Sequence, residues 1–128
     1  MNERQFQGYI LDVAARFGWR AWHVPAPMRP VGGGLMVPET RAAGLPDLIL
    51  MHPDPPRLIF AEVKDADGKL SEAQAEFLRL ARGVAEASAV SELAAEQWSG
   101  GRIIGVYVWR PGNEDLIEAV LRGKVMIS

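Results

Sequence analysis

Apolar residues recur at helical spacing near the start of the chain. Phe6, Ile10, Val13 and Phe17 stand three or four positions apart, which is the period of one face of an α-helix. The polar residues just before them match a capping box that begins at Asn2, and a glycine follows the last apolar position. The pattern therefore predicts a helix over residues 3–17.

Strand patterns occupy four further segments. Short runs rich in apolar and β-branched residues predict strands over residues 20–24, 45–51, 57–64 and 102–109. The second and third runs are separated by His-Pro-Asp-Pro-Pro, a sequence typical of a tight turn, and we expect them to form a hairpin. Residues 25–44 contain four prolines and three consecutive glycines, so we expect a loop without lasting regular structure there.

A second capping box, from Ser71 to Gln74, begins another helical pattern. Its apolar stripe is expected at Phe77, Leu80, Ala81 and Val84. The alanine- and glutamate-rich residues 84–98 also predict helix, with a break expected near Ser88, and residues 114–121 predict a last helix. The resulting order, α, β, β, β, α, β, α, predicts an α/β fold with an αβββαβ core and a mixed central sheet flanked by helices.

Length and composition fit a single folded unit. The chain has 128 residues, of which 48% are hydrophobic and 23% charged, and we expect one domain over residues 1–128. No apolar run approaches the ~20 residues that span a bilayer, and no signal peptide is evident, so we expect a cytoplasmic protein without a membrane partner. There is no cysteine, which leaves oxygen and imidazole as metal ligands, and two histidines disfavour a zinc enzyme.

Charge is unevenly distributed along the chain. The net charge is −2, which argues against a general nucleic-acid coat protein. Residues 65–100 carry seven acids and three bases, whereas the rest of the chain carries nine acids and eleven bases, most of them arginine. The planar guanidinium group of arginine suits phosphate, to which it donates two parallel hydrogen bonds.

Three charged side chains are predicted to meet at one end of the hairpin. Glu62 and Lys64 are two residues apart in one strand, so they lie on the same face of the sheet. Counting from the turn places Asp47 opposite Glu62, to within a residue or two of register. Two neighbouring carboxylates repel each other unless a proton or a cation joins them.

A divalent cation would remove this repulsion. Mg²⁺ accepts two carboxylates and several waters, and a hard ion suits a chain without cysteine. We therefore expect Mg²⁺ (or Mn²⁺) to be bound by Asp47, Glu62 and the backbone carbonyl of Val63. Lys64 would stand beside the ion and hold a phosphate oxygen or a water molecule.

Two further polar residues are expected to reach the same place. Helical phase puts Glu3 in line with the inward stripe of the first helix, from which it could reach the ion. Gln74 has the corresponding position on the second helix, three residues before Phe77. Each also has a structural explanation, Glu3 as a first-turn acid favoured by the helix dipole and Gln74 as one arm of the capping box.

The segments GLPDLIL, FAEVK and SEAQ, in this order of elements, resemble the PD-(D/E)XK nuclease superfamily. The chain is most similar there to the virus-type replication-repair nuclease (VRR-NUC) family, over residues 3–121. The resemblance implies a restriction-endonuclease-like fold and a Mg²⁺- or Mn²⁺-dependent DNA endonuclease. It also implies a homodimer that cuts branched DNA such as Holliday junctions. The site residues that it implies are Glu3, Asp47, Glu62, Lys64 and Gln74, with Glu3, Asp47 and Glu62 around the metal and Gln74 supporting the site.

Alternative functions fit the same segments. One is a non-catalytic DNA-binding or interaction module that keeps the nuclease fold, and another is the catalytic subunit of a larger restriction, repair or transposition complex. Loop positions make Arg29, Arg41 and Arg110 the expected contacts to DNA phosphates. His23 and His52 are expected to be structural or solvated.

Overall fold

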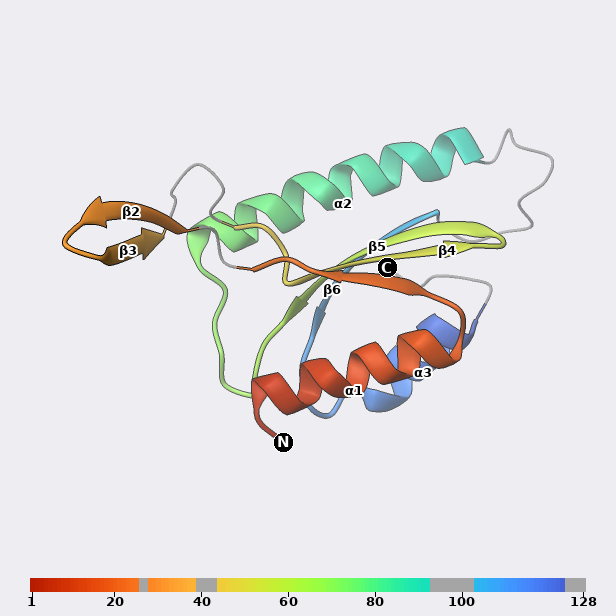
Figure 1. The fold of residues 1–128 in the computed structure, drawn as a ribbon. Helices are drawn as coiled ribbons and strands as arrows, with labels where there is room; N and C mark the ends of the chain where they lie inside the picture. Colours follow the sequence, from red (N-terminus) through yellow and green to blue (C-terminus); the bar gives the residue numbers. More distant parts are fainter. Residues whose placement is uncertain (26–27, 39–43, 93–102, 124–128) are drawn as a thin grey trace.

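A four-stranded mixed sheet lies between two layers of helices (Figure 1). The computed structural model describes residues 1–25, 28–38, 44–92 and 103–123. The expected α/β class, with a mixed sheet flanked by helices, is confirmed in these residues. They contain helices α1 (Glu3–Arg16), α2 (Glu72–Glu92) and α3 (Glu114–Arg122), and strands β1 (Arg20–His23), β2 (Met28–Gly32), β3 (Leu35–Pro38), β4 (Leu48–Pro53), β5 (Pro56–Val63) and β6 (Ile104–Trp109).

The strand order of the main sheet is β1-β4-β5-β6. The pairs β1–β4 and β4–β5 are antiparallel, whereas β5 and β6 are parallel and are connected through α2. The β4–β5 hairpin pairs Leu48 with Ala61 and Ile49 with Phe60. Because this register continues by one position, it places Asp47 opposite Glu62, as the sequence predicts.

The face of the sheet toward α1 and α3 carries the main hydrophobic core. Alternate residues of β5 point to this face, where Ile59, Ala61 and Val63 are fully buried. The predicted apolar stripe of α1 is confirmed, since it packs against these strands. The helical residues of this core are Phe6, Ile10, Val13 and Ala14 of α1 and Ile117, Val120 and Leu121 of α3.

Helix α2 covers the opposite face of the sheet only in part. Its buried residues are Leu78, Ala81 and Ala85, and the small alanines let the helix approach Val106 of β6. The predicted stripe is confirmed at Phe77 and Ala81 but was wrong at Leu80 and Val84, which are 55% and 59% exposed. Of the helices described, none is long and apolar enough to cross a membrane.

The expected break near Ser88 does not occur, because α2 is continuous to Glu92. The alanines and glutamates of this segment have high helix propensity, which outweighs the weak preference of one serine for a break. The rest of the predicted helix, residues 93–98, lies outside the described residues.

Residues 28–38 form a separate two-stranded sheet, although a loop was expected over residues 25–44. Strands β2 and β3 pair antiparallel, with an irregularity between Pro30 and Gly32. The three consecutive glycines at the end of β2 and in the connection to β3 all have positive φ, so they make the turn of a hairpin instead of a loose loop. Proline is tolerated because both strands are edges of this small sheet.

Gly44 brings the segment before β4 into contact with the first turn of α2. Its φ is +92°, a conformation in which residues other than glycine are strained. A Cβ at this position would overlap the backbone carbonyl of Ala73. The glycine therefore lets the chain that carries Asp47 approach the helix that carries Gln74.

Gly44→Ala is expected to lower the free energy of unfolding by about 2–4 kcal/mol, because it adds both backbone strain and an overlap with α2. Gly112→Ala is the matched control, since its φ is +105° but no atom lies within 4 Å of its Cβ. Strain alone should cost the control about 1–2 kcal/mol. Chemical denaturation measures both values, and equal losses would contradict the close contact.

Candidate active site

Glu62 is a charged residue buried at the end of β5, on the face of the sheet that α2 covers. Its side chain is 2% exposed. Its Oε1 accepts a hydrogen bond from Gln74 Nε2 at 3.1 Å and lies 3.6 Å from Lys64 Nζ. Its Oε2 is buried and has no hydrogen-bond partner among the described residues. Because an unpartnered buried carboxylate oxygen is costly, this atom is where a proton or a cation would be stabilised.

Asp47 supplies the second carboxyl group. It precedes β4 by one residue, and its Oδ2 accepts a hydrogen bond from the backbone N–H of Val63 at 2.8 Å. This bond ties the side chain to the end of β5. The Asp47 carboxyl group lies near that of Glu62 and raises its pKa, because two neighbouring carboxylates favour the protonation of one of them. The pair predicted from the hairpin register therefore forms.

The pKa of Glu62 is raised from its ordinary value of 4.5 to about 8. Burial is the largest cause, the neighbouring Asp47 carboxyl group adds to it, and Lys64 opposes it. Without a metal ion the site therefore holds a proton at neutral pH. A divalent cation would take the place of that proton, so two carboxylates with one unpartnered oxygen fit a hard metal ion.

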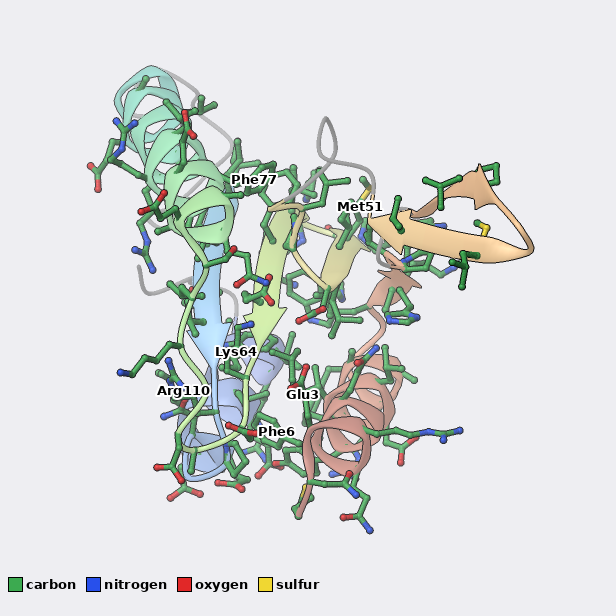
Figure 2. All side chains as sticks on the ribbon, turned by 90° about the vertical axis from the view of Figure 1, so that its left-hand side faces the viewer. Glu3, Phe6, Met51, Lys64, Phe77 and Arg110 are labelled. Atoms are coloured by element: carbon green, nitrogen blue, oxygen red, sulfur yellow. The ribbon has the colours of Figure 1, made fainter. Side chains whose placement is uncertain are left out.

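Lys64 follows β5 directly, and its side chain is 16% exposed. Its backbone N–H donates to the carbonyl of Trp109 at 3.0 Å, which extends the pairing of β5 with β6. Arg110, the next residue after β6, donates from Nη1 to the carbonyls of Asp65 and Gly68. Figure 2 shows Lys64 and Arg110 at this end of the sheet. Arg110 therefore anchors the loop that leaves the site.

The anchoring role of Arg110 is not evident from the sequence, because it depends on the parallel pairing of two strands separated by a helix. The sequence predicted a phosphate contact for this residue, and that role stays a prediction. Arg41 and the side chain of Arg29, the other two expected contacts to DNA, lie outside what the structure describes.

Gln74 combines the two roles that its sequence position allowed. Its Oε1 accepts a hydrogen bond from the Ser71 N–H at 2.9 Å, and its own N–H donates to Ser71 Oγ at 3.1 Å. These bonds form the predicted capping box. The side-chain amide group donates at the same time to Glu62, so the cap of α2 orients the buried carboxylate.

Glu3 departs from the position expected for it. Its side chain is exposed in the first turn of α1, whereas the sequence placed it on the inward face. The first turn of α1 and the end of β5 do lie toward the same end of the molecule (Figures 1 and 2). Within the described residues, no group of three or more acidic, histidine or cysteine side chains is arranged to hold a metal ion.

The backbone of Val63 enters the site differently from the prediction. Its N–H group contacts a site residue, since it donates to Asp47 Oδ2. Its carbonyl as a metal ligand stays a prediction. The N–H contact is a consequence of Asp47 lying just beyond the last paired residue of the β4–β5 ladder.

The histidines have the structural or solvated roles expected of them. His23 is exposed on β1. His52 Nδ1 accepts a hydrogen bond from the Asp54 N–H at 3.1 Å, so its Nε2 is protonated and donates to the Phe17 carbonyl at 3.0 Å. Its ring contacts Trp19 edge-on. Neither histidine belongs to the group around Glu62.

Comparison with known proteins identified no relative of this chain. No family model, no curated protein and no solved structure matches the chain significantly. Inferences about function therefore depend on the residues at the end of β5 and on the sequence resemblance.

The pH dependence of stability tests the environment of Glu62. In the metal-free protein the raised pKa of Glu62 means that its contribution to stability is complete below about pH 4.5 and is lost as the pH rises through about 8. One such group changes the free energy of unfolding by at most about 1.4 kcal/mol per pH unit. Denaturation in EDTA from pH 4 to 9 measures this loss. Glu62→Gln should abolish it, and an unchanged profile in that variant would contradict the assignment.

Gln74→Glu separates the capping role from the site role. A glutamate can still accept the Ser71 N–H, but it removes the donor to Glu62 and adds a third carboxyl group. We expect its melting temperature in EDTA to be near that of the wild type at pH 5 and clearly lower at pH 8. Gln74→Ala should instead lose about 1 kcal/mol at both values, because the cap is lost. Equal behaviour of the two variants would show that the contact with Glu62 is unimportant.

Proposed function

We propose that this protein is a metal-dependent DNA endonuclease that hydrolyses phosphodiester bonds at the end of β5. The observation that supports the proposal most directly is the buried Glu62 carboxylate, which lies against Asp47 and beside Lys64 and has an oxygen without a partner. A buried acid of this kind is destabilising unless a proton or a cation neutralises it, and a role in metal binding explains why the acid is there at all.

Each residue has a distinct role in the proposed reaction. Asp47 and Glu62 would hold Mg²⁺ or Mn²⁺, with the Val63 carbonyl and Glu3 as candidate further ligands. When bound, the ion supplies a Lewis acid for the phosphate and lowers the pKa of a nearby water molecule. The ammonium group of Lys64 stabilises the negative charge that develops on the phosphate oxygens.

The amide of Gln74 keeps the Glu62 carboxylate in one orientation. Hydrolysis adds one water molecule across a P–O bond of the backbone and leaves a phosphate end and a hydroxyl end. This chemistry needs no covalent intermediate with the protein.

The substrate and assembly are proposed from the sequence resemblance. The segments GLPDLIL, FAEVK and SEAQ support membership of the PD-(D/E)XK superfamily and its VRR-NUC family. They favour a homodimer acting on branched DNA. The mixed four-stranded sheet with α1 before it and α2 between β5 and β6 is compatible with this proposal.

Cleavage of a four-way junction with Mg²⁺ tests the proposal. We expect cleavage to require the metal, and Glu62→Gln, Asp47→Asn and Lys64→Met each to lower its rate by at least about 100-fold. Glu76→Gln is the matched control, because this exposed acid on α2 has the same charge but lies outside the site. Wild-type activity in Glu62→Gln would overturn the proposal.

Calorimetry with Mn²⁺ separates the alternative functions. Binding with micromolar affinity or better, lost in Asp47→Asn and Glu62→Gln, is expected for the nuclease. A protein that binds DNA but no Mn²⁺ would be the non-catalytic module. One that binds Mn²⁺ through these residues but cuts no DNA would be the catalytic subunit of a larger complex.

A further inference from the structure

The β2–β3 hairpin exposes large apolar side chains at its tip. Leu35 is 67% exposed, Met36 52% and Val31 48%. Neither hydrophobic cluster of the described residues includes a side chain from these two strands. Exposed apolar side chains that are gathered on one projecting element indicate a contact surface, because solvent gives them no favourable partner.

The shape of the hairpin restricts what this surface can contact. Gly32, Gly33 and Gly34 have φ values of 97°, 61° and 76°, and a Cβ on any of them would meet no atom within 4 Å. The turn is therefore narrow and free of side chains, with apolar residues directly on both sides of it. A thin apolar tip is suited to a slot between two flat surfaces more than to a broad protein face.

Position and charge favour DNA as the contact. The hairpin projects beyond the N-terminal end of α2, on the side of the molecule where β5 ends (Figure 1). Residues 28–38 contain one charged residue, Arg29, and no acid. The hairpin therefore does not repel a polyanion, and DNA bound at the end of β5 can extend against it.

We propose that the hairpin is a wedge that places Leu35 and Met36 against an unstacked base step of the DNA bound at the site. Leucine and methionine side chains that enter between bases stabilise a kink, and a branch point already offers unstacked bases at low cost. The hairpin thereby selects branched over continuous duplex DNA. This inference rests on the proposed nuclease function for the presence of DNA at the site.

Binding with Ca²⁺ in place of Mg²⁺ tests the wedge without relying on cleavage. The probe is a four-way junction with 2-aminopurine at the branch point, compared with a continuous duplex of the same sequence. The wild type should raise 2-aminopurine fluorescence in the junction. Leu35→Ser combined with Met36→Ser should lose most of this rise and bind the junction about 10-fold more weakly, with duplex affinity changed less than about 2-fold.

The control is Leu116→Ser, which removes a 41% exposed leucine from α3 and should leave both measurements unchanged. An unaltered fluorescence rise in the double variant would overturn the wedge. So would light scattering that shows the double variant to be a monomer and the wild type a dimer, since a second copy would then cover the hairpin.

The wedge proposal and the nuclease proposal can be refuted separately. Junction-specific fluorescence without Mg²⁺-dependent cleavage supports the wedge and refutes the nuclease. Normal cleavage with an unaltered double variant refutes the wedge alone, and a wild-type chain that binds no junction refutes both.

Discussion

The carboxyl groups of Asp47 and Glu62 are held together at the end of the β4–β5 hairpin. The other groups of the site offset part of the free-energy cost of this arrangement. Glu62 is almost fully buried, so its charge is poorly solvated, and Asp47 adds a second negative charge beside it. Lys64 and the Gln74 amide offset part of the cost on one oxygen of Glu62. The other oxygen has no described partner. Such an arrangement is stable only with a proton or a cation, which links folding, pH and metal binding in one group.

The two faces of the sheet contribute differently, one mainly to stability and the other to the site. The face toward α1 and α3 contains most of the buried apolar side chains and supplies the stability of the fold. The face toward α2 has a smaller cluster and leaves Leu80 and Val84 of the helix exposed. Because the stable face holds β5 rigidly, the opposite face can carry a strained pair of acids at its end.

Three contacts hold the surroundings of the carboxyl pair in place. The capping box of α2 positions Gln74, the guanidinium group of Arg110 holds the loop after Lys64, and Gly44 lets the chain before β4 lie against α2. All three use backbone groups at the ends of secondary-structure elements. The site therefore depends on how the elements are joined as much as on the side chains that would bind a metal.

The sequence by itself determined the local structure and half of the site. Strand alternation places Glu62 and Lys64 on one face, the length of the turn places Asp47 opposite, and capping boxes locate α1 and α2, because these depend on residues close together in the chain. Tertiary structure decided the exposure of Glu3, the phase of α2 and the role of Arg110. Each of these depends on packing between distant segments. The β2–β3 hairpin shows the same limit, since its prolines and glycines fit both a loop and a tight turn, and only strand pairing separates the two.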